Sequence, residues 1–307
     1  MGDRLKGKVA VIAGAGRGLG RAMALLMADE GASVVVNDLG CATDGSGASA
    51  ELADEVVGQI RDRKGIAVAS HDSVTTMEGG EKIVGTAVDN FGRLDILVNS
   101  AGSYSFALIE NMTEAEWDAR VVIHLKGPFI CIKCACAVMK QQRSGRIINL
   151  ASESGLGHPG AAHYSAAKEG LLGLTRTVAQ EMGQYGITCN AIRPRAVTET
   201  AASGAREMYH LWRNAKVPIP AFFWGSSDEW RPEDVAPFVV YLATDQAAGI
   251  NGYDFLVYGQ TVSLMSQPQA IRSIYSPSRW TVDELMDVIP KTLSAGLVNP
   301  APPIKEA

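Results

Sequence analysis

Short apolar runs alternate with longer amphipathic stretches along the first 260 residues. The runs are rich in β-branched residues, which is typical of strands, and the longer stretches repeat their apolar positions at helical spacing. The predicted strands are 8–13, 33–37, 66–70, 95–99, 146–150, 188–192 and 255–257. The predicted helices are 21–30, 49–63, 78–91, 114–140, 164–185 and 232–243.

The predicted strands are continuous runs of Val, Ile and Leu rather than alternating patterns, so both of their faces are expected to be buried. Strands of this kind between helices predict an α/β fold, a Rossmann-type doubly wound parallel sheet. Length alone fits one or two domains. Because no Pro-, Gly- or Ser-rich linker divides the first 260 residues, we expect one domain over 1–263. A Pro/Ser-rich C-terminal extension follows over 264–307, with one helical pattern at 281–289.

The stretch 198–231 breaks this rhythm and is predicted to be a loop-like insertion. It concentrates large apolar side chains and prolines, namely Met208, Tyr209, Trp212, Pro218, Pro220, Phe222, Phe223, Trp224 and Trp230. Such side chains bury large apolar area, which favours a lid over a bulky hydrophobic substrate. Alternatively, about half of these aromatic side chains pack in the core or at an oligomer contact.

Composition narrows the possible partners. The chain has 28 Lys and Arg against 33 Asp and Glu, a net charge of −5. This charge disfavours nucleic acid and anionic membrane surfaces and leaves a small molecule as the expected partner. The first apolar run is too short for a signal peptide or a membrane span, so a cytoplasmic location is expected. The five cysteines are odd in number, and Cys131, Cys134 and Cys136 have no second pair at zinc spacing, so buried thiols and no metal are expected.

A glycine-rich turn joins the first strand to the first helix. It is Ala13-Gly14-Ala-Gly-Arg17-Gly18-Leu19-Gly20. Glycines allow the backbone to approach a pyrophosphate at a helix N-terminus, although a tight turn without ligand has the same composition. Asp38, at the end of the second strand, can bind a ribose 2′-hydroxyl and repel a 2′-phosphate, which favours NAD over NADP. Arg17 favours the opposite choice, and Asp38 could instead cap its loop.

The candidate catalytic residues come later in the chain. Tyr164 and Lys168 are four residues apart, on one face of a predicted helix. An ammonium beside a phenol is expected to lower the pKa of the phenol, which would let it act as acid and base near neutral pH. Ser152 follows a predicted strand and can hydrogen-bond a substrate oxygen as its charge changes.

Together these residues resemble the short-chain dehydrogenase/reductase family over roughly residues 5–260. The remaining family motifs stand as Asp72, Asn99-Ser-Ala101-Gly102 and Pro194. The resemblance implies that Tyr164 is the acid/base, that Lys168 lowers its pKa and binds the nicotinamide ribose, and that Ser152 orients the substrate oxygen. It implies that Asp72 contacts adenine and that Asn99 supports the cofactor strand. The further cofactor-binding positions that it implies are Gly14, Arg17, Gly18, Leu19, Gly20, Asp38, Ser73, Ala101, Gly102, Pro194 and Val197.

Within the family, Val36-Asn-Asp38-Leu-Gly and Val122-Ile-His124-Leu-Lys-Gly127 look most like the dehydrogenase part of the peroxisomal multifunctional β-oxidation enzyme. That subgroup includes hydroxyacyl-CoA and 17β-hydroxysteroid dehydrogenases. His124 replaces the usual Asn of the family's catalytic tetrad, and could hold a proton-relay water or be a structural helix residue. Ala13, Ser100 and Arg195 are further departures from the pattern.

Several charged residues near these motifs have two interpretations. His158 and His163 flank Tyr164 and could touch substrate, or be solvated loop residues. Glu153 could tune Ser152 or be solvated. Arg193 and Arg195 could receive an acidic substrate or coenzyme A phosphates, or pair with neighbouring carboxylates.

The sequence therefore predicts an NAD-dependent oxidoreductase that interconverts a secondary alcohol and a ketone on a bulky hydrophobic substrate. A hydroxysteroid, an alicyclic alcohol and a 3-hydroxyacyl-CoA are the substrate types considered. One alternative is an NADPH-dependent carbonyl reductase. Another is a catalytically silent binding subunit of the same fold, which the altered motif positions suggest. The family resemblance also implies a homo-oligomer, either a dimer or a tetramer.

Overall fold

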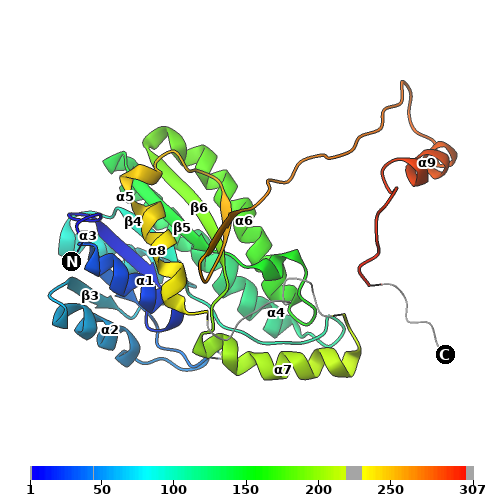
Figure 1. Cartoon of the computed structure of the whole chain (residues 1–307). Helices are drawn as coiled ribbons and strands as arrows, with labels where there is room; N and C mark the ends of the chain where they lie inside the picture. Colours follow the sequence, from blue (N-terminus) through cyan, green and yellow to red (C-terminus); the bar gives the residue numbers. More distant parts are fainter. Residues whose placement is uncertain (1, 44, 219–229, 302–307) are drawn as a thin grey trace. The chain divides into compact units, whose positions relative to one another are not determined.

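A computed structural model describes residues 2–43, 45–218 and 230–301. Within it the chain forms two compact units, Met1–Met265 and Ser266–Ala307. The first unit holds the sheet and the helices that pack on it, coloured blue to orange in Figure 1. The second has one short helix, α9 (Val282–Val288), which begins with a capping box between Thr281 and Glu284.

The first unit is built on one eight-stranded sheet. Its strands are β1 (Val9–Ala13), β2 (Ser33–Asn37), β3 (Ile66–Ser70), β4 (Ile96–Asn99), β5 (Gly145–Leu150), β6 (Ile187–Pro194), β7 (Asp254–Tyr258) and β8 (Thr261–Leu264). Their order is β3-β2-β1-β4-β5-β6-β7-β8, parallel from β3 to β7. The predicted doubly wound parallel sheet is confirmed. The antiparallel edge strand β8 was not predicted, because its residues alternate between half-buried and exposed and form no continuous apolar run.

Helices cover both faces of this sheet. They are α1 (Gly18–Asp29), α2 (Glu51–Asp62), α3 (Met77–Phe91), α4 (Glu114–Val121), α5 (Gly127–Gln142), α6 (Ala162–Met182), α7 (Glu199–Ala215) and α8 (Pro232–Ala243). One core cluster joins α1, α2 and α8 to the sheet, and the other joins α3, α5 and α6 to its opposite face. Along β1, Ala10 and Ile12 belong to the first cluster, and Val9 and Val11 to the second. Both faces of the strand are therefore buried, as its continuous apolar sequence predicted.

The strand order changes direction at β1, which lies between β2 and β4. The connections from the carboxyl ends of β1 and β4 therefore lead to opposite sides of the sheet and leave a crevice between them. Ligands of open α/β sheets bind in such a crevice. The fold thus places the glycine turn after β1 and the segment after β4 beside each other, and Ser100 N–H donates to Ala13 O at 2.9 Å.

The predicted single helix 114–140 is interrupted. It consists of α4, a π-helical turn η1 (Val122–Lys126), and α5. Pro128 lies in the first turn of α5, and its nitrogen has no hydrogen to donate to the carbonyl four residues earlier, that of His124. The π-turn therefore falls where the regular ladder is broken.

The helical stretch Glu114–Gln142 is long and apolar enough to cross a membrane by length and composition. Its side chains Cys131, Ile132, Ala135 and Met139 are buried in the second core cluster. A core helix of a globular fold passes the same test, so this stretch is weak evidence for a span.

The prediction of a loop-like insertion at 198–231 is wrong for its first half, which forms the 17-residue helix α7. Met208 and Trp212 are one helical turn apart and are 4% and 2% exposed, so this helix has an apolar face. The density of aromatic side chains obscured that spacing in the sequence. Pro220, Phe222, Phe223 and Trp224 lie outside the described residues.

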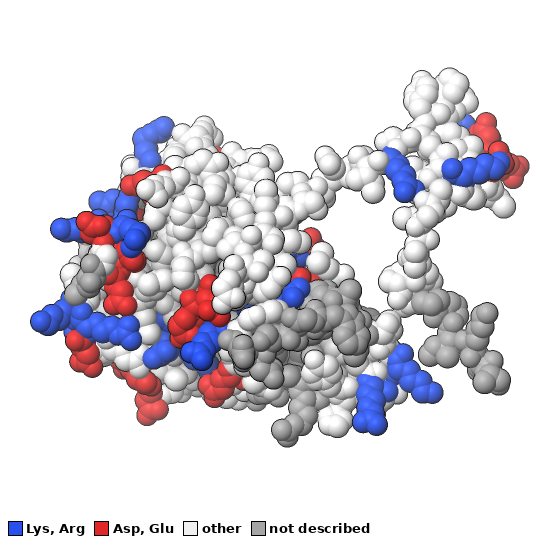
Figure 2. Space-filling view, viewed as in Figure 1, with Lys and Arg blue, Asp and Glu red and all other residues white. Residues whose placement is uncertain are grey.

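Charged side chains of both signs share the surface. On the face shown in Figure 2, Lys and Arg side chains lie close to Asp and Glu side chains in mixed groups. Arg4 pairs with Glu30 at 2.6 Å, and Arg63 pairs with Asp29 at 3.1 Å.

Candidate active site

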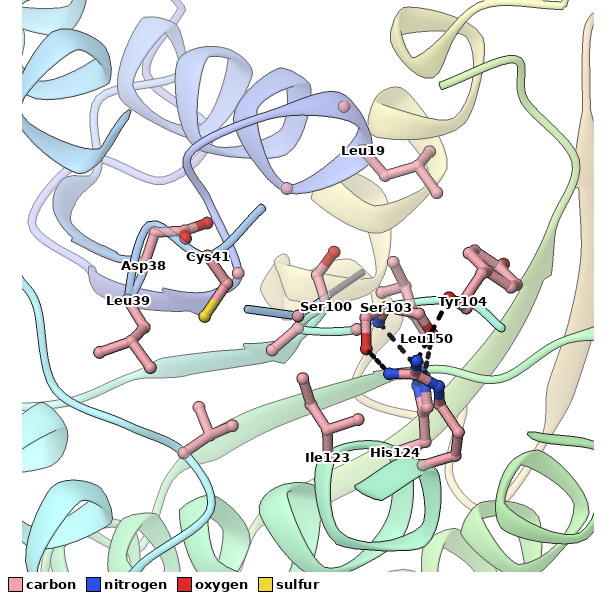
Figure 3. A pocket seen from close by; sticks show the side chains of 18 of the residues that line it. Leu19, Asp38, Leu39, Cys41, Ser100, Ser103, Tyr104, Ile123, His124 and Leu150 are labelled. Atoms are coloured by element: carbon pink, nitrogen blue, oxygen red, sulfur yellow. Dashed lines mark hydrogen bonds between the residues drawn. The ribbon is translucent and has the colours of Figure 1, made fainter. Parts of the chain in front are cut away.

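A cavity of about 520 Å³ opens at the carboxyl ends of β1, β4 and β5. Figure 3 shows Asp38, Leu39 and Cys41 on one side of it and Ser103, Tyr104 and His124 on the other. The predicted site residues that line it are Gly14, Arg17, Gly18, Leu19, Gly20, Asp38, Asp72, Ser73, Ala101, Gly102, His124, Ser152, Tyr164, Lys168 and Pro194. The fold therefore brings together residues that are far apart in the sequence.

The glycine turn has no room for side chains. Gly14 has a φ of +82°, and a Cβ there would lie 2.4 Å from the Cα of Ala101. At Gly20, a Cβ would lie 1.8 Å from the carbonyl oxygen of Gly14. Helix α1 begins at Gly18 without a side-chain cap, so its first N–H groups point into the turn free of a capping oxygen. Such a backbone cradle fits the pyrophosphate of a dinucleotide.

The Asp38 carboxylate borders this turn. One of its oxygens accepts from Gly16 N–H at 2.8 Å and the other from Gly40 N–H, also at 2.8 Å. Asp38 therefore caps its loop and lines the cavity at the same time. Arg17 donates from Nη2 to the carbonyl of Cys41, which ties the glycine turn to the loop after β2.

Ser152, Tyr164 and Lys168 meet beside β5. Ser152 lies just after that strand, and its hydroxyl accepts from Ser154 N–H at 3.1 Å. Tyr164 and Lys168 are both buried and lie on one face of α6, the predicted geometry. Lys168 Nζ donates to the carbonyl of Leu150 at 2.5 Å and lies 5.5 Å from the centroid of the Tyr164 ring.

The ionisation of Tyr164 differs from the expectation. Burial, together with contact to Tyr104, raises the pKa of Tyr164 well above 10, although the Ser152 hydroxyl acts to lower it. Burial also lowers the pKa of Lys168 to about 7. The predicted lowering of the phenol pKa by Lys168 is therefore outweighed, because the enclosed site disfavours both charged forms and the ammonium is directed to Leu150.

His124 lies in the π-turn with its ring 4.7 Å from that of Tyr164, edge to face. Its Nε2 donates to the carbonyl of Ser103 at 2.8 Å. Its Nδ1 is buried and has no hydrogen-bond partner among the residues that the structure describes. Burial, followed by the charge of Lys168, holds the pKa of His124 well below 6.5, so the ring is neutral. His124 thus fixes the loop after β4 and leaves one ring nitrogen unused.

Two predicted cofactor residues do not line the cavity. Asn99 is buried and donates to Asn149 Oδ1 at 2.8 Å. This hydrogen bond links the side chains of the neighbouring strands β4 and β5. Val197 is 44% exposed, and its N–H donates to the carbonyl of Trp230. The neighbouring Ala196 and Thr198 line the cavity instead, since adjacent residues of an extended segment face opposite ways.

Sequence reasoning missed Tyr104 and Arg120. The hydroxyl of Tyr104 lies 2.9 Å from that of Tyr164. Arg120, on α4, donates to Ser103 Oγ and, at 3.0 Å, to Ser105 Oγ. No motif marks either residue, and only the fold brings them to the cavity.

The two histidines near Tyr164 are buried, not solvated as the alternative supposed. His158 Nδ1 and the hydroxyl of Ser154 are 2.9 Å apart, and the ring packs on Trp212. His163 Nε2 is 3.2 Å from Ser105 Oγ. Burial lowers the pKa of both rings, that of His158 to about 4. Trp212 therefore packs against the loop that precedes α6.

The charged residues that had two interpretations form ion pairs. Arg193 Nε is 2.8 Å from Asp254 Oδ2, so it pairs with a neighbouring carboxylate. Arg195 pairs with Glu153, which is 8% exposed rather than solvated. Both arginines are therefore part of the framework that borders the cavity.

The prediction of buried thiols holds for Cys131, whereas Cys134 and Cys136 are only partly buried. Cys131 is fully buried, and burial raises its pKa to about 12; the pKa of Cys136 is raised to about 11 for the same reason. Within residues 2–43, 45–218 and 230–301, no group of three or more His, Cys, Asp or Glu side chains is placed to hold a metal ion.

The doubly wound sheet, the glycine cradle and the Ser–Tyr–Lys cluster define a dinucleotide-binding oxidoreductase. A family model described as "Enoyl-(Acyl carrier protein) reductase" matches residues 14–259. The chain belongs to the short-chain dehydrogenase/reductase family, and is thus an NAD(P)-dependent oxidoreductase.

Two relatives and one solved structure illustrate the similarity. The chain is 37% identical over 293 residues to the hydroxyacyl-CoA dehydrogenase ChsB1 of Mycobacterium tuberculosis, covering 92% of this chain and 87% of that protein. It is 42% identical over 251 residues to the peroxisomal multifunctional enzyme type 2 of Drosophila melanogaster, covering 81% of this chain but only 39% of the longer protein. A short-chain dehydrogenase from Mycobacterium avium superposes with a TM-score of 0.79 at 36% identity, covering 98% of each chain.

Proposed function

We propose that this protein oxidises a secondary alcohol to a ketone with NAD as its cofactor. The observation that carries the proposal is the convergence of Ser152, Tyr164 and Lys168 on the cavity that also holds the glycine turn and Asp38. Nucleotide-binding geometry and a proton-transfer group in one cavity are what alcohol oxidation requires.

The residues divide the chemistry among them. The Tyr164 phenolate takes the proton of the substrate hydroxyl, while Ser152 Oγ donates to the same oxygen as it becomes a carbonyl. Lys168 would hold the nicotinamide ribose and orient Tyr164. A nicotinamide bound in this cavity would supply the acceptor for the hydride of the carbinol carbon. The proton and the hydride together account for the two hydrogens that the alcohol loses.

Asp38 supports the choice of NAD. Its carboxylate lines the cavity and is held by two backbone N–H groups, so it cannot turn away from an approaching 2′-phosphate without losing both hydrogen bonds. Arg17, the residue that favours NADP in the sequence, is directed to the carbonyl of Cys41. Both contacts favour a ribose with a free 2′-hydroxyl.

For the substrate we propose a hydroxyacyl thioester as the first choice, ahead of a hydroxysteroid or an alicyclic alcohol. The support is the similarity to the hydroxyacyl-CoA dehydrogenase of Mycobacterium tuberculosis over 92% of the chain. The described aromatics of the predicted lid carry less weight than the sequence suggested, because Trp212 packs beside His158 and Trp230 beside Tyr258.

Reduction of a ketone is a second candidate, and the protonation of the site favours it. A Tyr164 whose pKa lies well above 10 is protonated near neutral pH, which is the form that donates a proton to a carbonyl oxygen. The chain is also 38% identical over 262 residues to a 3-oxoacyl-[acyl-carrier-protein] reductase of Synechocystis. The same residues serve both directions.

Turnover assays test these proposals. Purified protein is mixed with NAD or NADP and hydroxyacyl thioesters, hydroxysteroids or alicyclic alcohols, and with NADH or NADPH and the matching ketones, while reduced-nicotinamide absorbance is followed. We expect turnover with a hydroxyacyl thioester and NAD. Faster turnover with NADPH and a ketone would favour the reductase. Measurable NAD binding without any turnover would instead identify a silent binding subunit.

A further inference from the structure

The substrate end of the cavity contains a second phenol, that of Tyr104, in contact with the proposed acid/base. Its hydroxyl is 2.9 Å from the hydroxyl of Tyr164, and the two rings are tilted by 43° with centroids 4.8 Å apart. Tyr104 lines the cavity, as Tyr164 does. At this distance the two hydroxyls form a hydrogen bond in which either oxygen can be the donor.

The loop that carries Tyr104 is fastened at both ends. On one side, His124 Nε2 donates to Ser103 O, and Arg120 donates to the side chains of Ser103 and Ser105. Arg120 Nη2 also donates to the carbonyl of Tyr104 itself, at 3.3 Å.

On the other side, Ala107 N–H donates to Gly160 O at 2.9 Å, in a bridge that joins this loop to the segment before α6. The Tyr104 ring also stacks on Phe106. The backbone on both sides of Tyr104 is thus anchored to α4, η1 and the start of α6, so its phenol is held in place beside Tyr164.

We propose that Tyr104 is a positioning residue of the reaction: its hydroxyl forms a proton-sharing pair with Tyr164 and holds the acid/base oxygen in place. This inference rests on the proposed function, in which Tyr164 is the acid/base. When the pair loses one proton, the remaining O–H donates to the phenolate oxygen, which stabilises the ionised form that oxidation needs.

The physical basis is that two phenols in contact do not ionise independently. The first ionisation leaves a donor beside the phenolate, and the second would place two negative charges next to each other. The two directions fit one shared ionisation. Contact with Tyr104 raises the pKa of Tyr164, and the hydrogen bond with Tyr164 acts to lower the pKa of Tyr104 against the effect of burial. The first proton therefore leaves the pair as a unit, with the negative charge shared by both oxygens, and it is the second ionisation that the contact makes harder.

Other charged and titratable groups surround the pair. Lys168 and His163 come from α6, His124 from η1 and Arg120 from α4. The two histidines have lowered pKa values and stay neutral above pH 7, and Lys168 loses its proton at about 7. An alkaline rise in activity above pH 8 therefore reports on the phenols.

The test is the pH dependence of kcat/KM for alcohol oxidation in wild type, Tyr104→Phe and Tyr253→Phe. Phenylalanine keeps the ring of Tyr104 and removes only its hydroxyl, so we expect the alkaline rise to move upward by about one pH unit, a ~10-fold loss at a fixed pH on the rising limb. Tyr253 is 41% exposed and does not line the cavity, and Tyr253→Phe should leave the profile unchanged. An unchanged profile in Tyr104→Phe, or a lower KM alone, would overturn the proposal.

A spectroscopic measurement tests the Tyr104–Tyr164 pair without any enzyme turnover, so its outcome does not depend on the proposed dehydrogenase activity. In protein labelled with ¹³C at the tyrosine Cζ atoms, the resonance that disappears in Tyr164→Phe identifies Tyr164. We expect Tyr104→Phe to move that resonance at neutral pH, because it removes the hydrogen bond, whereas Tyr253→Phe should not. A Tyr164 resonance that is the same in wild type and Tyr104→Phe would refute the pair even if the enzyme proved to have no dehydrogenase activity.

Discussion

Arg195 and Glu153 form a two-point ion pair beside Ser152. Arg195 Nη2 donates to Glu153 Oε1 at 2.8 Å, and its Nε donates to the other carboxylate oxygen. The guanidinium also lies 4.9 Å from the centroid of the Tyr258 ring and 5.7 Å from that of Trp230. The pair joins the segment after β6 to the residue that follows Ser152, and both segments border the cavity. Arg195, which follows Pro194, therefore has a structural role: it ties these two segments together.

Breaking this pair should destabilise the fold. We expect Glu153→Gln to lower the free energy of unfolding by about 1–3 kcal/mol, because it leaves a partly buried guanidinium without its charged partner. Denaturant unfolding measures the change. Glu78→Gln is the matched control, since Glu78 pairs with Lys82 on the exposed face of α3, and its loss should leave the free energy of unfolding nearly unchanged. Equal effects of the two substitutions would contradict a structural tie.

Removing the hydroxyl of Tyr164 should abolish proton transfer. We expect Tyr164→Phe to lower kcat at least ~100-fold, because no other group of the proposed mechanism takes the proton of the substrate hydroxyl. Calorimetric titration with NAD should give a dissociation constant within about twofold of wild type, since the ring remains. Tyr253→Phe, at a phenol that is 41% exposed, is the control and should keep wild-type kcat. Wild-type turnover by Tyr164→Phe would reject this assignment.

Local patterns predicted the elements and residues whose environment is set by near neighbours in sequence. The β-branched run of β1 could only be buried on both faces, and the spacing of Tyr164 and Lys168 placed both side chains on one face of α6. The antiparallel strand β8 has no such run, and it exists because β7 offers it an edge.

The contacts around Tyr104 depend on the fold. Tyr104 and Tyr164 are 60 residues apart, and no periodicity or motif links them. In the sequence, Arg120 has no feature that distinguishes it from the other charged residues of its helix. In the fold, the loop after β4 accepts its hydrogen bonds, through the Ser105 hydroxyl and the Tyr104 carbonyl. The direction of the Tyr164 pKa could not be predicted for the same reason, because burial is a property of the assembled cavity.

Asp38 should control the choice of cofactor. We expect Asp38→Asn to raise the ratio of kcat/KM with NADP to kcat/KM with NAD at least ~10-fold, because it removes the negative charge that repels a 2′-phosphate. Asp54→Asn removes a charge from an exposed position on α2 and should leave the ratio unchanged. If both variants keep the wild-type ratio, Asp38 acts only as the cap of its loop.

Lys168 should give the folded protein a characteristic pH dependence of stability. Burial lowers its pKa from 10.5 to about 7, so between these values the unfolded chain binds more protons than the folded one. The free energy of unfolding of wild type should therefore rise with pH across this window, by up to about 1.4 kcal/mol per pH unit from this group, and the full destabilisation should be present below pH 7.

Lys168→Met removes the titrating amine. The free energy of unfolding of this variant, minus that of wild type, should therefore be highest near pH 7 and fall by about 2–3 kcal/mol toward pH 9. Urea unfolding of wild type, Lys168→Met and Lys133→Met at pH 7, 8 and 9 measures the trend, with Lys133 as the control because it is exposed on α5. If the difference between Lys168→Met and wild type were the same at all three pH values, the amine would be charged in the folded protein. The effect of burial on it would then be offset by a nearby acceptor, for which the Leu150 carbonyl at 2.5 Å is the first candidate.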